Sequence, residues 1–196
     1  MPASLPYLDY SEALPRVDKL ATVRTEALTG FAANKTPDGP LVGAYGELIA
    51  EIYFEDLKTA GRIRSYRYTG GGIGPDFEID TLEKTTLTVD VKTKRRSGTP
   101  RANYEMSVPA YLSEHPAYVD PDFFLCVSLA PYASKVGGFK EAWIVGSISG
   151  EKFRANCYRI EQDSPVGGQN GVSGKMPCDV FNSRFSKLNK PKGEGV

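Results

Sequence analysis

The sequence has a single histidine, His115, and only three cysteines. One imidazole excludes nucleases and metalloproteases whose site needs a pair of histidines. The cysteines, Cys126, Cys157 and Cys178, are widely spaced and never form a CxxC pair, so neither a disulfide framework nor a zinc knuckle is predicted. Any chemistry in this chain must therefore use carboxylates, lysine and, where one is bound, a metal ion.

The chain also lacks a net charge and a long apolar run. Its 24 Lys and Arg residues balance 24 Asp and Glu residues, so a polyanionic partner would have to bind a local basic patch. The longest strongly apolar run, residues 123–130, is far too short to cross a bilayer, and the start, MPASLPYLDY, lacks the basic and apolar sections of a signal peptide. We therefore expect a cytoplasmic protein with no membrane partner.

The apolar pattern of the 196 residues predicts one domain that alternates helices and strands. We expect helices over 11–32 and 42–60, an edge strand over 62–69, strands over 75–80 and 85–96, a helix or helical turn over 102–115 broken by Pro109, and the strands DFFLCVSLA and EAWIVGSIS. DFFLCVSLA is apolar throughout, which is typical of a central strand. The order predicts an α/β fold with a central mixed β-sheet flanked by α-helices.

The single domain, 1–196, divides into three parts on this pattern. The N-terminal helical extension covers 1–40, the core covers 41–149, and the C-terminal extension covers 150–196. The C-terminal part contains the glycine-rich stretch 164–177, which we expect to be a long mobile loop, and a basic, frayed tail from Lys187. The functional residues are expected in the core.

Acidic residues gather on two of the predicted core strands. Asp76, Glu78 and Asp80 occupy alternate positions in PDFEID. In TLTVDVKTK, alternation puts Asp90 and Lys92 on one face while valines hold the other. We interpret Glu78 and Asp80 as a solvated face, which leaves Asp76, Asp90 and Lys92 as the candidate group.

An antiparallel hairpin centred near Glu83 would bring the two strands together. Its register pairs Asp80 with Thr86, Glu78 with Thr88, and Asp76 with Asp90. The last pair places two carboxylates opposite each other, with Cβ atoms about 5 Å apart. Like charges in that position are unfavourable unless one takes a proton or a cation lies between them.

A Mg²⁺ ion fits this pair of carboxylates. Mg²⁺ prefers hard oxygen ligands, usually from one or two carboxylates, and can take substrate phosphate oxygens in the rest of its shell. The main-chain carbonyl of Val91 would supply a further ligand. Lys92 could hold or deprotonate an attacking water and offset charge in the transition state. The sequence therefore predicts a Mg²⁺ site at Asp76 and Asp90, with Mn²⁺ as a substitute.

These residues together resemble the PD-(D/E)XK nuclease superfamily, which has the restriction-endonuclease-like fold. The resemblance covers about 41–149 and is carried by Pro75-Asp76, by Asp90-Val91-Lys92 and by a glutamate in GAYGELIAEIYF. It implies a metal-dependent phosphodiesterase with Asp76 and Asp90 as metal ligands and Lys92 as the catalytic lysine. Aspartate at position 90, where glutamate is more frequent, lies within the family's pattern.

The resemblance also implies that a helix glutamate completes the site. Glu47 is preferred because GAYGE resembles the family's small-residue approach to that position. Glu51 lies one helical turn later on the same face and is the alternative. The choice between the two stays open on the sequence alone.

A basic stretch, KTKRRSGTPR, follows the predicted metal site and contains no acid. We expect four of its cations to grip the phosphate backbone of DNA next to the scissile bond: Lys94, Arg95, Arg96 and Arg101. A solvated basic loop is the alternative interpretation. The glycine-rich GGGIG is not read as a phosphate loop, because no GKS or GKT follows it and the next element is a strand.

The function implied by the resemblance is a Mg²⁺-dependent deoxyribonuclease that hydrolyses DNA phosphodiester bonds. One or two Mg²⁺ ions would orient the water and stabilise the leaving 3′ oxygen, with no covalent intermediate. An endonuclease is preferred over an exonuclease, and a homodimer is implied because many relatives act as dimers. Two alternatives stay open: a non-catalytic nucleic-acid-binding or assembly module of the same fold, and an enzyme that processes RNA or damaged DNA.

Overall fold

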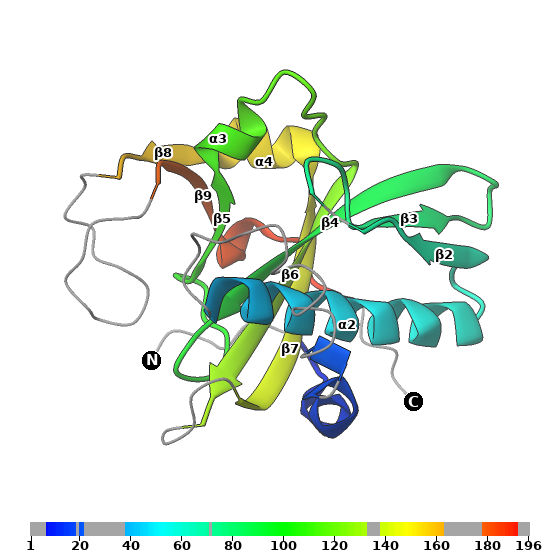
Figure 1. The fold of residues 1–196 in the computed structure, drawn as a ribbon. Helices are drawn as coiled ribbons and strands as arrows, with labels where there is room; N and C mark the ends of the chain where they lie inside the picture. Colours follow the sequence, from blue (N-terminus) through cyan, green and yellow to red (C-terminus); the bar gives the residue numbers. More distant parts are fainter. Residues whose placement is uncertain are drawn as a thin grey trace.

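The computed structural model describes residues 7–18, 20–21, 38–70, 72–132, 138–162 and 178–191. Its elements are β1 (Leu8–Asp9), η1 (Ser11–Ala13), α2 (Asp38–Thr59), β2 (Ser65–Tyr68), β3 (Phe77–Asp80), β4 (Thr86–Arg95), β5 (Glu105–Pro109), α3 (Ala110–Ser113), β6 (Phe123–Pro131), β7 (Phe139–Ser149), α4 (Gly150–Asn156), β8 (Tyr158–Ile160), β9 (Val180–Arg184) and η2 (Phe185–Lys187). Figure 1 shows their arrangement.

Six of the strands form a mixed, curled sheet in the order β1-β7-β6-β4-β3-β2. Strands β4 and β6 are parallel, and the other neighbouring pairs are antiparallel. Strand β6 lies inside the sheet and β2 at its edge, as the apolar and alternating patterns predicted. The chain is therefore an α/β protein with a mixed sheet, which confirms the fold class at that level.

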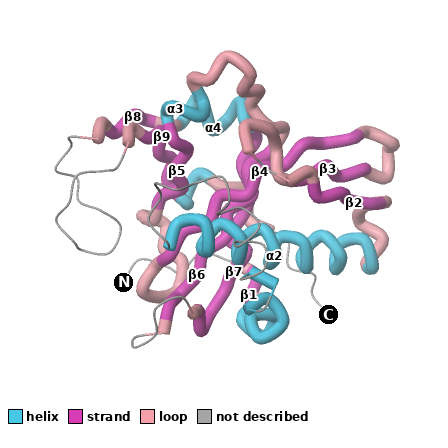
Figure 2. Tube along the Cα trace, in the orientation of Figure 1, coloured by secondary structure: helices cyan, strands magenta, loops and turns pink. Residues whose placement is uncertain are grey.

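Helix α2 lies across one face of the large sheet (Figure 2). It begins at Asp38, four residues earlier than predicted, and ends at Thr59. Gly61 has a φ of 67°, and the amides of Gly61 and Arg62 donate to the carbonyls of Lys58 and Leu57. This pair of bonds is the Schellman motif, in which glycine supplies the left-handed residue that stops a helix.

The large sheet separates two apolar clusters. On β6, Leu125, Val127 and Leu129 pack toward α2, whereas Phe124 and Cys126 pack toward the second cluster. On β4, Val89 and Val91 belong to the α2 side. Because side chains alternate along a strand, Asp90, Lys92 and Lys94 project from the opposite face of β4.

The second cluster is covered by a three-stranded antiparallel sheet, β5-β9-β8, together with α4 and η2. The pattern over 102–115 predicted a helix or helical turn broken by Pro109. This was wrong for 105–109, which is strand β5, whereas Ala110–Ser113 after Pro109 is helical. Met106 and Val108 are buried while Ser107 between them is partly exposed. This alternation spans too few residues to be separated from a helical pattern, and β5 forms because β9 pairs with it.

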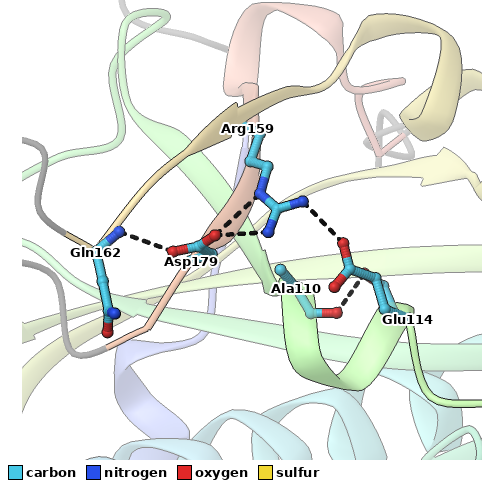
Figure 3. Close-up of polar contacts among 6 residues, drawn as sticks. Ala110, Glu114, Arg159, Gln162 and Asp179 are labelled. Atoms are coloured by element: carbon cyan, nitrogen blue, oxygen red, sulfur yellow. Dashed lines mark hydrogen bonds and ion pairs between the residues drawn. The ribbon is translucent and has the colours of Figure 1, made fainter.

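Ion pairs hold the small sheet against α3 (Figure 3). Arg159 on β8 donates to Asp179 at 2.6 Å and to Glu114 at 2.9 Å. Asp179 also accepts the amide of Gln162 at 2.9 Å, and the amide of Glu114 donates to the Ala110 carbonyl at 2.8 Å. Residues Gln162 and Asp179 are therefore joined directly, although they are far apart in the sequence.

Several predictions fall partly or wholly outside the described residues. The helix predicted over 11–32 is described as a 3₁₀ turn at 11–13 and as helix at 14–18 and 20–21. Its remainder, the stretch 164–177 and the last residues of the basic tail lie outside the described residues. Cys126 is a buried thiol and Cys157 a partly exposed one. No helix within the described ranges is long and apolar enough to cross a membrane.

Candidate active site

The predicted acids meet at the point where β3 stops pairing with β4. Strand β3 begins at Phe77, opposite Val89, whereas β4 continues to Arg95. Asp76 lies just before β3, where its amide donates to the Val89 carbonyl at 3.0 Å. Its carboxylate Oδ2 accepts the amide of Val91 at 2.7 Å. Two hydrogen bonds to the main chain of β4, one from the Asp76 amide and one to its carboxylate, therefore hold Asp76 beside this strand.

The register of this hairpin follows the predicted one. Asp80 pairs with Thr86, and Glu78 pairs with Thr88. Asp76 is one residue beyond the last paired position, so its side chain is not fixed as a cross-strand neighbour of Asp90. Instead it turns toward the next amide along β4, that of Val91, and this brings it beside the strand segment that carries Asp90 and Lys92.

Asp90 and Lys92 form a close ion pair on one face of β4. The Lys92 Nζ donates to Asp90 Oδ1 at 2.6 Å, with 15% and 7% of the two side chains exposed. The same Nζ lies 6.0 Å from the centre of the Phe124 ring on β6. The ammonium group is therefore held in a partly desolvated position next to a carboxylate.

The pKa of Asp76 is shifted by its burial and by the charged side chains around it. Only 8% of Asp76 is exposed, and its pKa is raised to about 8. Burial is the largest cause, followed by the negative charges of Asp90 and Glu47; the Val91 amide and Lys92 act in the opposite direction. The negative charges of Asp90 and Glu47 therefore favour the protonated form of Asp76, and a cation at this carboxyl would offset their repulsion.

Glu47 lies on α2, and its charge acts on Asp76. The residue before it, Gly46, touches β4 so closely that a Cβ there would lie 1.6 Å from the Thr93 Oγ1. Glu47 Oε2 accepts the hydroxyl of Tyr68, on strand β2, at 2.7 Å. The close helix–strand contact and the tyrosine together hold Glu47 near Asp76.

Glu51 lies elsewhere. It lines a groove of about 220 Å³ together with Arg16, Leu20 and Tyr66, and its charge acts on Tyr66. Of the two glutamates that the sequence left open, Glu47 is the one whose charge acts on Asp76. One helical turn is enough to carry Glu51 away from β4.

The donor atoms at the site are carboxylate and main-chain oxygens, which suit Mg²⁺. The N–H and C=O of one residue leave a strand on the same side, so the Val91 carbonyl faces the edge that Asp76 occupies. Within the described ranges, no group of three or more His, Cys, Asp and Glu side chains is arranged to hold a metal ion.

The prediction that Lys94 contacts DNA does not agree with its position. Lys94 is 6% exposed, and its Nζ lies 2.7 Å from the Ser107 Oγ on β5. Burial lowers the pKa of Lys94 to about 7. The sequence predicted a basic surface here because nothing in it revealed that β5 covers this end of β4.

The other predicted DNA contacts differ in exposure. Arg96 is half-buried: its guanidinium lies 5.3 Å from the Tyr104 ring centre and donates to the Glu105 carbonyl at 3.2 Å. Burial lowers its pKa. Arg95 is half-buried and Arg101 is exposed. A phosphate backbone could therefore reach Arg101 directly, whereas Arg96 is engaged inside the molecule.

Tyr118 is a residue near the site that the sequence did not reveal. It lies between α3 and β6, and its pKa is raised by burial and then by the charge of Asp90. The surrounding HPAYVDPD carries no motif, and its proximity to Asp90 arises only because β6 runs parallel to β4.

Comparison with known proteins finds no match for this chain. No family model matches the sequence, and no curated protein matches it either. A functional conclusion therefore depends on the residues around Asp76, at the start of β3.

Proposed function

We propose that this protein is a Mg²⁺-dependent nuclease with a restriction-endonuclease-like core, which hydrolyses DNA phosphodiester bonds as an endonuclease. The observation that supports this most strongly is the Asp76 carboxyl, whose pKa is raised first by burial and then by the charges of Asp90 and Glu47, close to the Lys92–Asp90 ion pair. Like charges held this close together are unfavourable for folding. Ionisable side chains with strongly shifted pKa values are concentrated at functional sites.

Asp76 and Asp90 would hold the Mg²⁺ ion, with Mn²⁺ as a substitute. The Val91 carbonyl and Glu47 would bind the ion directly or through water. Mg²⁺ usually takes one or two carboxylates and keeps several waters, so this site needs no third side-chain ligand. When bound, the ion would polarise the phosphate and lower the pKa of a coordinated water.

Lys92 would act on the substrate once Asp90 is neutralised by a cation. In the free protein its ammonium is paired with Asp90 at 2.6 Å. After that pairing weakens, the Nζ can hydrogen-bond the attacking water and stabilise the negative charge that develops on the phosphate. The Phe124 ring beneath it limits how far the side chain can turn away.

The protein as a whole would attract DNA only weakly, because the chain carries no net charge. With Lys94 inside the protein, Arg101 and Arg95 would make the contacts to the DNA phosphate backbone.

A second candidate function is a non-catalytic nucleic-acid-binding or assembly module of the same fold. The Lys92–Asp90 pair itself favours this function, because an internal ion pair can replace a metal ion. A homodimer would be compatible with either function.

Cleavage of a supercoiled plasmid tests the proposal. The wild-type protein is expected to relax or linearise the plasmid with Mg²⁺ or Mn²⁺ and to be inactive with EDTA. Asp90→Asn and Lys92→Met should each reduce the rate at least about 100-fold. Glu78→Gln is the matched control, because Glu78 lies on the same hairpin but pairs with the exposed Arg67.

The outcomes separate the two candidate functions. Cleavage that persists in Asp90→Asn and Lys92→Met would show that the site is elsewhere. DNA binding by the wild-type protein without any metal-dependent cleavage would select the binding module. Cleavage confined to linear DNA ends would replace the endonuclease by an exonuclease.

A further inference from the structure

Lys94 on β4 contacts a serine inside the protein instead of an acid. Only 6% of the residue is exposed, and its Nζ lies 2.7 Å from the Ser107 Oγ on β5. Among the described residues, no carboxylate lies within ion-pair distance of this Nζ. An unpaired charge is costly inside a protein, so burial favours the neutral amine. Unlike an ammonium, a neutral amine can accept the proton of a hydroxyl at this distance.

The charges around Lys94 come from three strands and the segment after β4. Burial is the largest cause that lowers the pKa of Lys94 to about 7, and the charge of Arg96 acts in the same direction. Cys126 on β6 and Glu105 on β5 act in the opposite direction, and Lys92 lowers the pKa further. Roughly half of the Lys94 side chains are therefore free amines at pH 7.

Ser107 lies on β5, the edge strand of the small sheet. Its neighbours Met106 and Val108 are fully buried, whereas Ser107 is partly exposed. Because side chains alternate along a strand, Ser107 projects from the face opposite to these two. The structure thus places a partly exposed serine in direct contact with a buried lysine.

A row of polar side chains crosses the small sheet from Ser107. Ser107 is directly opposite Asn182 on β9, and Asn182 is directly opposite Tyr158 on β8, which is 43% exposed. Opposite residues on neighbouring strands project from the same face. The Asn182 amide and the Tyr158 hydroxyl both donate to Glu105. A small molecule on this face would therefore meet a fixed polar surface with Ser107 at one end.

We propose that Ser107 is a nucleophile with Lys94 as its general base, and that this pair hydrolyses small carboxylic esters. A serine hydroxyl is a weak nucleophile until an adjacent base takes its proton, and lysine is one of the bases that do so in proteins. Esters are preferred over amides, because an alcohol needs less assistance to leave than an amine. This activity is separate from the nuclease function proposed above, and its mechanism uses none of the carboxylates of that site.

In the first step the Ser107 Oγ attacks the ester carbonyl carbon as the Lys94 Nζ takes the hydroxyl proton. The ammonium that forms offsets the negative charge of the tetrahedral intermediate. The bond from carbon to the alcohol oxygen then breaks, and the alcohol leaves with the proton that Lys94 returns. Water attacks the acyl-serine in the same way, with Lys94 again as the base, and releases the carboxylic acid and the free serine.

A fluorophosphonate probe tests the nucleophile directly, because an activated serine forms an oxygen–phosphorus bond with it as fluoride leaves. In EDTA, the wild-type protein should be labelled at Ser107, as mapped by mass spectrometry of its peptides, and should hydrolyse p-nitrophenyl acetate. Ser107→Ala should lose both reactions, and Lys94→Met should react at least about 100-fold more slowly. Ser113→Ala is the matched control and should react like the wild-type protein, because the Ser113 hydroxyl donates to the Ala110 carbonyl at 3.1 Å instead of contacting an amine.

The pH profile of the wild-type protein tests the base without any variant that has to fold. Only the free amine can take the serine proton, so the labelling rate should rise about tenfold per pH unit below pH 7 and level off above it. The urea midpoint of each variant shows whether a lost reaction reflects a lost fold.

Several results would overturn the proposal. These are an unlabelled wild-type protein, equal labelling of Ser107→Ala, and equal rates in a folded Lys94→Met. A labelling rate that does not change between pH 5.5 and pH 8.5 would show that Lys94 only holds Ser107 in place. Because the reactions are measured in EDTA and without DNA, they stand or fall independently of the nuclease proposal.

Discussion

Gly46 on α2 and Thr93 on β4 are in direct contact: a Cβ on Gly46 would lie 1.6 Å from the Thr93 Oγ1 and 2.7 Å from its Cβ. This contact brings the helix backbone onto the strand that carries Asp90 and Lys92. Glu47 follows Gly46 immediately and acts on the pKa of Asp76. Only glycine therefore fits at position 46, and the close contact it allows brings the Glu47 carboxylate near Asp76.

Gly46→Ala is accordingly expected to destabilise the protein by roughly 3 kcal/mol, because the new methyl group cannot fit without moving α2 away from β4. Gly43→Ala on the same helix is the control. A Cβ at Gly43 meets nothing within 4 Å, so alanine should be neutral or stabilise by about 0.5–1 kcal/mol. Urea unfolding at pH 7 measures both. Equal stabilities for the two variants would contradict the close packing.

The hydrogen bond from Tyr68 to Glu47 predicts an effect on metal binding. Tyr68→Phe removes the hydroxyl that donates to Glu47 Oε2 at 2.7 Å, so we expect the carboxylate to be held less firmly near Asp76. Removing a group that orients a metal ligand or its neighbour typically costs about tenfold in affinity or activity. We expect a similar rise in the Mg²⁺ concentration that gives half-maximal DNA cleavage.

Tyr66→Phe is the control for this change, because Tyr66 lies on the same strand and its hydroxyl pairs with Glu55. It should leave the Mg²⁺ requirement unaltered. An unaltered requirement in Tyr68→Phe as well would place Glu47 outside the metal site.

The parts of the fold that could be predicted are those with long or regular patterns. Helix α2 repeats its apolar residues over 22 positions, and β6 is apolar along almost its whole length. In the β3–β4 hairpin, the alternating sequence fixed the register, since a slip of one residue would turn every side chain to the other face of the sheet. The proximity of Asp76 to β4 followed from that register.

The parts that could not be predicted depend on contacts between distant segments. Strands β5, β8 and β9 have three to five residues each, too few for their alternation to stand out. Without β5, the sequence could not reveal that Lys94 is covered and bonded to Ser107. Tyr118 belongs to no motif, and only the parallel pairing of β6 with β4 brings its segment to Asp90.

Burial of Lys94 predicts a specific dependence of stability on pH. Its pKa is about 7 in the folded protein, against an ordinary 10.5. Between these values the unfolded chain binds a proton that the folded protein does not, so the free energy of unfolding rises with pH through this window. Below pH 7 both states are protonated, and the full cost of burying the charge is present.

Lys94→Met removes this cost. At pH 6 the variant should be more stable than the wild-type protein by about 2–4 kcal/mol, and the difference should shrink as the pH approaches 10. Lys152→Met on the exposed side of α4 is the control and should show no such trend. Urea unfolding at pH 6, 8 and 9.5 supplies the comparison. A difference that stays constant across these pH values would show that Lys94 is charged in the fold throughout.

Asp76 should give the opposite trend. Its pKa is raised to about 8 in the fold, against an ordinary 3.8, because it is buried beside Asp90 and Glu47. Between pH 4 and pH 8 the folded protein holds a proton that the unfolded chain has released. The contribution of Asp76 to stability is therefore present at low pH and is lost as the pH rises to about 8.

Asp76→Asn should abolish that loss, because an amide cannot ionise and its oxygen can still accept the Val91 amide. In EDTA, the wild-type protein should fall in stability relative to the variant between pH 5 and pH 8.5, by an amount on the order of 4 kcal/mol. Glu78→Gln, on the same hairpin, should follow the wild-type curve. Adding Mg²⁺ at pH 8.5 should restore the wild-type protein and leave Asp76→Asn almost unchanged, since the ion replaces the proton between the carboxylates. Parallel curves for the wild-type protein and Asp76→Asn, with no response to Mg²⁺, would mean that the carboxylates of Asp76, Asp90 and Glu47 do not form a cation site.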